Sequence, residues 1–240
     1  MTKVLSIIIP LYNEEKTIGQ LLEKVAAAPL PEGLRMQWII VDDASQDSTV
    51  AIVEEYMLLH AEQDMVLLRQ EKNKGKGGAL HRGIAHATGD YVLIQDGDLE
   101  YEPGEYARLL APVLSGDADV VYGSRFTREN PHRALSFWHA MGNKILTFLT
   151  NAVTDLHLTD METCYKLFKR ELLQSLHLRE QRFGFEPEVT IKASRYPQVR
   201  IYEVGISYYG RSYGEGKKIG WKDGVRAIYC ILRYGLLRIR

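Results

Sequence analysis

Short apolar runs and amphipathic stretches alternate along the first half of the chain. Runs rich in β-branched residues predict buried strands at 4–10, 38–41, 65–68, 91–94 and 119–123. Between these runs, apolar residues recur at helical spacing, which predicts helices at 14–28, 48–61, 77–87 and 103–114. Alternating strands and helices are typical of βαβ units, so we expect an α/β fold with a mostly parallel sheet and helices on both faces.

The pattern changes after Arg125, where a smaller and less regular half begins. A polar segment at 127–134 precedes a predicted helix at 135–152, and a further strand is expected near 199–204. The segments 160–169 and 185–194 complete this half.

Charge is distributed unevenly along the 240 residues. Apolar residues make up 45% and charged residues 25%, which is typical of a globular protein, and the net charge of −1 gives no case for a general nucleic-acid binder. The segment from Arg211 to Arg240 nevertheless holds eight Lys or Arg against two acidic residues. A basic tail on an acidic body predicts a local anionic partner, such as a diphosphate or a lipid surface.

The chain has two cysteines, Cys164 and Cys230, which lie far apart and lack the spacing of metal ligands. This usage favours a reducing, cytoplasmic compartment. The segment from Met1 to Pro10 lacks the features of a signal peptide, and no apolar run reaches the roughly 18 residues that span a bilayer. We therefore expect a soluble protein or one peripheral to a membrane.

Two acidic motifs follow predicted strands. Asp42 and Asp43 end the second strand, and Asp96 and Asp98 follow the fourth, with Glu100 two residues further on. In open α/β sheets the ligand crevice lies beyond the carboxyl ends of the strands. Carboxylate oxygens at that edge suit Mg²⁺ or Mn²⁺ shared with substrate phosphates. The alternative is a solvated acidic turn, since Asp and Gly are common in turns.

A glycine-rich segment, Asn73 to Gly78, leads into the third predicted helix. Such a loop can hold a phosphate at the helix N-terminus, and a flexible surface turn is an equal alternative. The segment does not match the P-loop or the dinucleotide-binding fingerprint.

Several motifs, taken in order, resemble family 2 glycosyltransferases and, within them, the polyprenyl-phosphate (dolichol-phosphate) mannose and glucose synthases. The residues that carry the resemblance are PLYNEE at 10–15, VDDASQDST at 41–49, NKGKGGAL at 73–80, QDGDLEY at 95–101, GSRF at 123–126, TDMETCYK at 159–166, FEPE at 185–188 and YYGRSYGEGKK at 208–218. They cover essentially the whole chain. Gly97 departs from the alanine expected in most relatives, a change that we expect to matter little.

The resemblance implies a GT-A fold, which is Rossmann-like, and an inverting, metal-dependent transfer of a hexose from a UDP- or GDP-sugar. Asp96, Asp98 and Glu100 would hold Mg²⁺ or Mn²⁺ against the donor diphosphate. The residues expected to contact the donor are Pro10, Tyr12, Glu14, Asp43, Lys76, Asp96, Arg211 and Lys217. For the cations of the tail, Arg211, Lys217 and Lys218, a solvated basic loop is an equal alternative.

The predicted acceptor is a polyprenyl phosphate, which needs cationic groups rather than a base because it is already an anion. Arg125 is the first candidate for this contact, followed by Arg133 and Lys144. We expect Asp98, Arg125 and Asp160 to be catalytic. Asp160 and Glu162 lie where some family members place a base for a hydroxyl acceptor, although a structural role for both is equally consistent.

The tail completes the expected organisation, with a catalytic domain at 1–210 and a basic loop and amphipathic helix at 211–240. Ile228, Ile231, Leu232 and Leu236 approximate one helical face among arginines, which predicts association with the cytoplasmic face of a membrane. The alternative is a helix packed onto the domain. Many relatives carry transmembrane helices after the catalytic domain, and we do not expect any here.

The leading hypothesis is therefore hexosyl transfer to a polyprenyl phosphate. Transfer to a hydroxyl of a glycan or small molecule is the second, and a noncatalytic nucleotide-sugar-binding protein is a third. A nucleotidyltransferase is disfavoured because no glycine-rich activation loop with lysine occurs near the N-terminus. The sequence does not determine the donor sugar, whose recognition depends on pocket shape.

Overall fold

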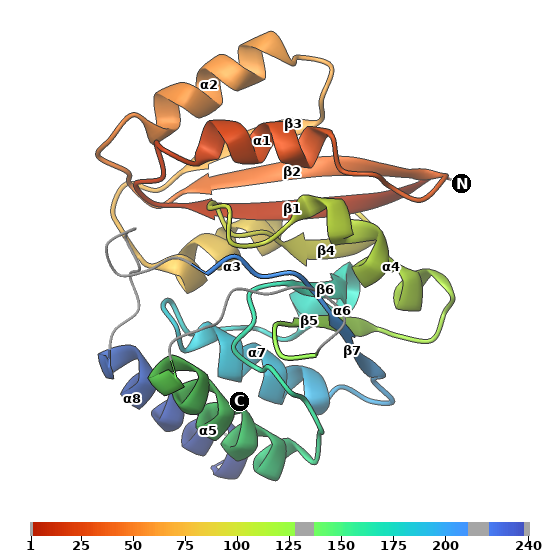
Figure 1. Ribbon diagram of the computed structural model, residues 1–240, viewed down its shortest axis with the longest axis vertical. Helices are drawn as coiled ribbons and strands as arrows, with labels where there is room; N and C mark the ends of the chain where they lie inside the picture. Colours follow the sequence, from red (N-terminus) through yellow and green to blue (C-terminus); the bar gives the residue numbers. More distant parts are fainter. Residues whose placement is uncertain (1, 128–136, 211–220, 238–240) are drawn as a thin grey trace.

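The computed structural model describes residues 2–127, 137–210 and 221–237, and it is built on one seven-stranded sheet with the order β3-β2-β1-β4-β6-β5-β7 (Figure 1). The strands are β1 (Lys3–Leu11), β2 (Leu34–Asp42), β3 (Met65–Arg69), β4 (Tyr91–Ile94), β5 (Val120–Ser124), β6 (Lys166–Lys169) and β7 (Ile201–Gly205). All pairings are parallel except those of β6, which runs antiparallel to β4 and to β5. The expected mostly parallel α/β sheet is confirmed.

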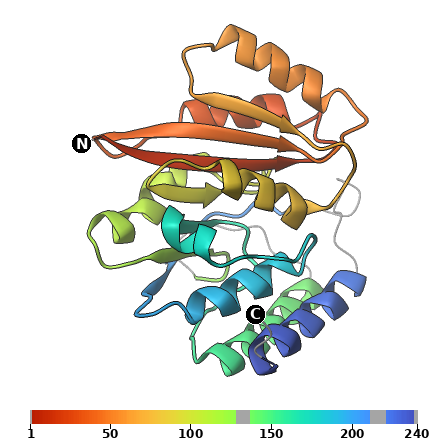
Figure 2. The same cartoon turned by 180° about the vertical axis from the view of Figure 1, so that it is seen from behind.

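Helices cover both faces of the sheet, as the sequence predicts (Figures 1 and 2). One face packs against α1 (Ile18–Ala26), α2 (Thr49–Leu59) and α4 (Tyr106–Leu114), which the short helix η1 (Pro103–Glu105) precedes. The other face packs against α3 (Lys76–His86), α6 (Arg170–Ser175) and α7 (Phe185–Ser194). Strand side chains alternate between the two cores, so that Ile7 and Ile9 contact the first group while Ile8 contacts the second.

Strand β6 is the element that the hydrophobic pattern does not reveal. It is four residues long and lies between β4 and β5, where Leu167 pairs with Leu93 on one side and Val121 on the other. Because β6 runs against its neighbours, it begins at the edge where β4 and β5 end. The preceding segment, 159–165, is thereby brought to the carboxyl ends of the parallel strands.

A third layer lies outside α7. Helix α5 (Phe137–Thr154) and helix α8 (Trp221–Cys230), which continues as the π-helical turn η3 (Ile231–Leu236), run side by side there (Figures 1 and 2). Cys230, Ile231 and Tyr234 are buried against Ile191 of α7. The predicted face of the tail is thus wrong in one member, since Ile231 lies in this core while Ile228, Leu232 and Leu236 are exposed. Ile228, Leu232 and Leu236 recur every four residues and stay on the exposed side, whereas Ile231, three residues after Ile228, lies on the side that contacts α7.

Candidate active site

Asp43, at the end of β2, fixes the start of the glycine-rich segment. Its buried carboxylate accepts hydrogen bonds from the backbone amides of Lys74 (2.8 Å) and Gly75 (2.7 Å) and from the side-chain amide of Gln70 (2.7 Å). Burial raises the pKa of Asp43 above its ordinary value, although the two backbone amides act against this shift. Asp43 therefore joins two strand ends to the N-terminus of α3.

The glycines of this segment are required by close packing. A Cβ atom on Gly75, whose φ is +84°, would lie 2.8 Å from the carbonyl oxygen of Gln181, and one on Gly77 would overlap the carbonyl oxygen of Glu180. The amide of Gly78 donates to the Gln181 carbonyl at 2.9 Å. The amides of residues 74, 75 and 78 are thus already bonded within the protein, so these three do not form the phosphate cradle that the sequence suggested.

Lys76, in the first turn of α3, turns inward toward the metal-binding motif. Its ammonium group lies 2.6 Å from Oδ1 of Asp96, 2.7 Å from Sγ of Cys164 and 3.7 Å from Oε1 of Glu186. Burial lowers the pKa of Lys76, but the carboxylates of Asp96 and Glu186 outweigh it and hold the pKa well above its ordinary value. Lys76 is therefore a fixed cation beside Asp96.

The motif Asp96-Gly97-Asp98 follows β4 and lies against the end of β1. Asp98 is buried, and its Oδ1 accepts from the amide of Glu100 at 3.0 Å. A Cβ atom on Gly97 would overlap Cδ2 of Leu11 and lie 3.0 Å from the carbonyl oxygen of Pro10. An alanine at this position would require the tip of the Leu11 side chain to move, so the expectation that glycine in place of alanine matters little stays a prediction.

Among the described residues, no three His, Cys, Asp or Glu side chains converge on one metal position. The predicted trio of Asp96, Asp98 and Glu100 is therefore not a preformed ligand set, because Glu100 turns toward Tyr208, whose hydroxyl donates to its Oε2 at 2.9 Å. Asp96 and Asp98 still fit a hard cation, since Mg²⁺ is bound through one or two carboxylates together with substrate phosphates.

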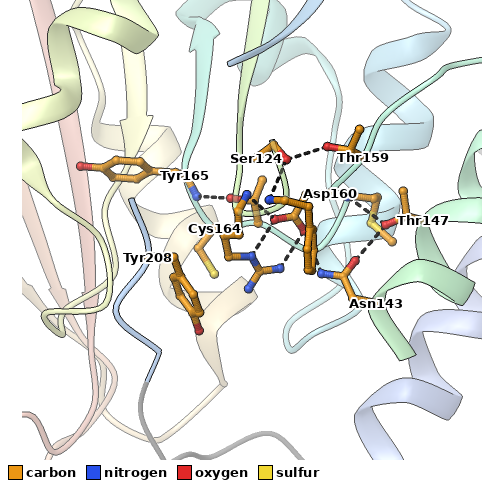
Figure 3. A network of polar contacts seen from close by, with 12 residues as sticks. Ser124, Asn143, Thr147, Thr159, Asp160, Cys164, Tyr165 and Tyr208 are labelled. Carbon is orange, nitrogen blue, oxygen red and sulfur yellow. Dashed lines mark hydrogen bonds and ion pairs between the residues drawn. The ribbon is translucent and has the colours of Figure 1, made fainter. Parts of the chain in front are cut away.

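Arg125 and Asp160 form a buried ion pair beyond the end of β5. Nε and Nη2 of Arg125 lie 2.6 Å and 2.7 Å from the two oxygens of Asp160, which also accept from the Arg125 amide and from Nδ2 of Asn143. Figure 3 shows Asn143 of α5 pointing at this carboxylate, and the hydroxyl of Thr147 donates to Oδ1 of Asn143 at 2.9 Å. Burial opposes ionisation of Asp160, but Arg125 outweighs it, so the pKa lies below its ordinary value. Asp160 is suited to orient Arg125 rather than to accept a proton.

The pKa of Glu162 is shifted in the opposite direction from that of Asp160. Its Oε1 is buried and has no hydrogen-bond partner among the described residues. Burial and the nearby charge of Glu186 raise its pKa to about 7, although Lys166 and Arg125 act in the other direction. Glu162 is therefore the side chain of this segment that can exchange a proton near neutral pH.

Of the remaining predicted residues, two lie beside the motif at 96–98, since a Cβ atom on Gly97 would lie 3.0 Å from the carbonyl oxygen of Pro10 and 3.7 Å from Cγ of Glu14. Pro10 lies at the end of β1, with Tyr12 and the buried Glu14 just beyond it, and Glu14 accepts from the hydroxyl of Thr17 at 3.0 Å. Lys144 is exposed on α5. Arg133, Arg211 and Lys217 lie outside the described residues.

Sequence reasoning did not assign a function to several buried polar residues of the site. Glu186 pairs with Lys166, and Glu203 accepts from the amides of Thr159 and Asp160. Asn143 holds the carboxylate of Asp160. The FEPE motif at 185–188 marks Glu186 in the sequence, but its pairing with Lys166 depends on the fold.

Comparisons with known proteins show the family and the fold. Residues 6–176 match the family described as Glycosyl transferase family 2. The dodecaprenyl-phosphate galacturonate synthase of Rhizobium johnstonii is 27% identical over 217 residues, which cover 89% of this chain and 61% of that protein. The undecaprenyl-phosphate 4-deoxy-4-formamido-L-arabinose transferase of Aeromonas hydrophila is 26% identical over 90% of this chain and 63% of its own length. The chain thus spans about three fifths of these two relatives.

A third relative, an uncharacterised protein of Methanocaldococcus jannaschii, is 32% identical over 84% of this chain and 90% of its own length.

Solved structures show the same fold. Glucosyl-3-phosphoglycerate synthase from Mycobacterium tuberculosis, solved with Mn²⁺, UDP and glucosyl-3-phosphoglycerate, superposes with a TM-score of 0.72 at 21% identity, covering 97% of this chain and 80% of that one. A mannosyltransferase from Pyrobaculum calidifontis, solved with GDP-mannose and Mn²⁺, gives 0.65 at 21% identity over 90% and 59%. The fold is therefore that of the GT-A glycosyltransferases, and the chain belongs to glycosyltransferase family 2.

Proposed function

We propose that this chain transfers a hexose, with inversion, from a UDP- or GDP-sugar to a polyprenyl phosphate at a membrane surface. The observation that carries the proposal is the pair formed by Arg125 and Asp160. A lipid phosphate needs a fixed cation and no base, and Asp160 holds the Arg125 guanidinium with both of its oxygens. The names of the polyprenyl-phosphate relatives support the same acceptor.

The donor would bind along the edge where β1, β2 and β4 end. Asp96 and Asp98 would hold a divalent metal, which when bound supplies positive charge to the leaving diphosphate. Lys76, held by Asp96 and Glu186, adds a second fixed charge at the same edge. Asp43 keeps the loop between β3 and α3 in place beside the nucleotide, with Pro10, Tyr12 and Glu14 on the neighbouring strand end.

The membrane surface is supported by the outer layer formed by α5, α8 and η3. No helix in the described part of the chain is long and apolar enough to cross a bilayer. These helices nevertheless expose a row of large apolar side chains, which we call the apolar face. It consists of Phe137, Trp138, Met141, Ile145, Phe148, Val225, Ile228, Tyr229, Leu232, Leu236 and Leu237. Apolar patches of this kind beside Arg226 and Arg233 suit the boundary of an anionic bilayer.

On this proposal, residues 1–210 hold the catalytic groups and the segment 211–240 contributes α8 to the apolar face. Vesicle flotation tests the face with variants that spare the buried core. Leu232→Ser with Leu236→Ser, or Trp138→Ser with Phe148→Ser, should reduce recovery with anionic vesicles. Leu58→Ser with Leu59→Ser is the matched control, because these exposed leucines lie on α2 at the far side of the sheet. Equal recovery of all variants would contradict membrane docking.

The function itself is tested with purified protein, Mn²⁺ or Mg²⁺, a short polyprenyl phosphate and a panel of UDP- and GDP-sugars. We expect release of nucleoside diphosphate and an acid-labile lipid-linked sugar, both lost in Asp98→Ala. Pyrophosphate release would instead indicate nucleotidyl transfer. Donor binding without turnover on any acceptor would support the noncatalytic hypothesis.

A second function is favoured by Glu162. A hydroxyl acceptor needs a general base, and a carboxyl group whose buried Oε1 has no hydrogen-bond partner among the described residues and whose pKa is about 7 is suited to that task. Transfer to a hydroxyl of a glycan or small molecule is therefore the alternative. Products formed on hydroxyl compounds and absent with polyprenyl phosphate would establish it.

A further inference from the structure

The carboxylate of Glu180 is bonded almost entirely by the C-terminal helix. Nε and Nη2 of Arg226 lie 3.0 Å and 2.7 Å from its Oε2, and the hydroxyl of Tyr234 donates to its Oε1 at 3.0 Å. Arg233 lies 3.8 Å from the same Oε1. Only 5% of Glu180 is exposed. Burial opposes its ionisation, but the bonds from Arg226 and Tyr234 outweigh burial and hold its pKa below the ordinary value.

The backbone around Glu180 is held on its other side by α7. Glu188, which is fully buried, accepts from the amides of Arg179 (2.9 Å) and Glu180 (2.7 Å). Lys192 pairs with the same carboxylate at 2.8 Å. The segment 179–182, which we call the strap, is thus fixed between α7 and α8.

The strap in turn fixes the glycine-rich loop. Its carbonyl oxygens at Glu180 and Gln181 lie where side chains on Gly77 and Gly75 would be, and Gln181 accepts from the amide of Gly78 at 2.9 Å. This loop carries Lys76 to Asp96 and donates two amides to Asp43. A displaced strap would therefore move contacts at the ends of both β2 and β4.

We propose that Glu180 is a positioning residue for the donor nucleotide: by joining α8 to the strap, it keeps the glycine-rich loop in the conformation that binds the nucleotide. The inference rests on the proposed function, because it takes this loop as the donor site. Glu180 acts through the loop and has no contact with the reacting atoms. The geometry therefore predicts that Arg226 of α8, which is half-exposed and bonds to Glu180, influences donor binding through Glu180.

Nucleotide affinity in the absence of acceptor and vesicles tests the proposal. The dissociation constants of UDP and GDP with Mn²⁺ are measured by calorimetry for the wild-type protein, Glu180→Gln and Arg226→Gln. We expect both variants to bind the preferred nucleotide roughly fivefold or more weakly, with the larger loss in Glu180→Gln. If Glu180→Gln fails to fold, Arg226→Gln still tests the proposal, because Arg226 is half-exposed.

The matched control is Asp64→Asn. It breaks an exposed ion pair with Arg35 at the opposite edge of the sheet, and its nucleotide affinity should equal that of the wild type. Lower thermal midpoints in Glu180→Gln and Arg226→Gln with unchanged nucleotide affinity would indicate a purely structural residue and overturn the inference. A folded wild-type protein that binds neither nucleotide would overturn the proposed function and the inference together.

Discussion

Arg125 and Asp160 meet through two parallel contacts, Nε to Oδ2 at 2.6 Å and Nη2 to Oδ1 at 2.7 Å. A planar guanidinium held in this way has one fixed orientation, which a lysine at the same position would not keep. The backbone amide of Arg125 and the side chain of Asn143 occupy the remaining acceptor positions of Asp160. The pair therefore presents a cation at the site while the carboxylate stays bonded.

The first prediction separates orientation from proton transfer. Asp160→Asn keeps the side-chain shape but removes the charge that fixes Arg125, so acceptor transfer should fall by roughly 10- to 100-fold and remain measurable. Product formation with polyprenyl phosphate is the measurement. Asp155→Asn is the control, because Asp155 is exposed and has a φ of 57°, which asparagine adopts readily. Complete loss of turnover in folded Asp160→Asn would point to a general base.

The second prediction concerns Glu162 and pH. Its pKa is raised from 4.5 to about 7, so the folded state resists ionisation and stability is lost as pH rises through that range. Glu162→Gln removes this loss, and above pH 7 the variant should be more stable than the wild type by up to about 3 kcal/mol. Urea unfolding at pH 4.5 and pH 8 measures the difference, which should be smallest at the lower pH.

Activity of the same variant distinguishes the two proposed acceptors. With a phosphate acceptor, Glu162→Gln should keep its rate at pH 7.5. With a hydroxyl acceptor, the wild-type rate should rise with pH to a plateau above about 7, and Glu162→Gln should abolish that rise.

A third prediction addresses the metal. Asp98→Ala should weaken Mn²⁺-dependent binding of the donor nucleotide and lower turnover by roughly 100-fold or more, as should chelation of the wild-type enzyme. Calorimetry of nucleotide binding with and without Mn²⁺ checks the first effect independently of turnover. Asp117→Asn, an exposed change on the turn before β5, should leave both quantities unaltered. Nucleotide binding that is equally strong without metal would contradict the assignment of Asp96 and Asp98.

The fourth prediction uses two helical glycines with opposite surroundings. Gly77→Ala places a carbon against the carbonyl of Glu180, so it should destabilise the protein by about 1 to 3 kcal/mol and weaken nucleotide binding. Gly142→Ala on α5 meets nothing within 4 Å and should stabilise it by about 0.5 to 1 kcal/mol. If both substitutions change the free energy of unfolding in urea equally, the strap moves aside to accommodate the new side chain at position 77, and this prediction is wrong.

The sequence predicted the regular half of the fold well because each strand there is a continuous apolar run between amphipathic helices. β4 occupies the predicted residues 91–94, and β1 and β2 differ only in their ends. β6 was not predicted, because its four residues include a lysine at each end and its burial depends on pairing with β4 and β5. Sequence spacing carries no information about such nonlocal pairing.

The residues of the candidate site were likewise predictable only in part. Asp43, Asp96 and Asp98 could be placed because they follow predicted strands. The partners of Asp160 could not be placed from the sequence, since Asn143 lies on helix α5 and Glu203 on strand β7. Lys76 was assigned to the donor by its loop, whereas the buried ion pairs that turn it toward Asp96 and Glu186 exist only in the folded chain.

The antiparallel strand β6 has a mechanical consequence. On the proposed function, the donor-side residues follow β2 and β4, and the acceptor-side residues follow β5 or precede β6. Hydrogen bonds of a single sheet join these four strands, with β1 between β2 and β4. No hinge separates the two halves of the site along this path. If the proposed function holds, the distance between the donor sugar and the acceptor is therefore set by the sheet when the chain folds, before either substrate binds.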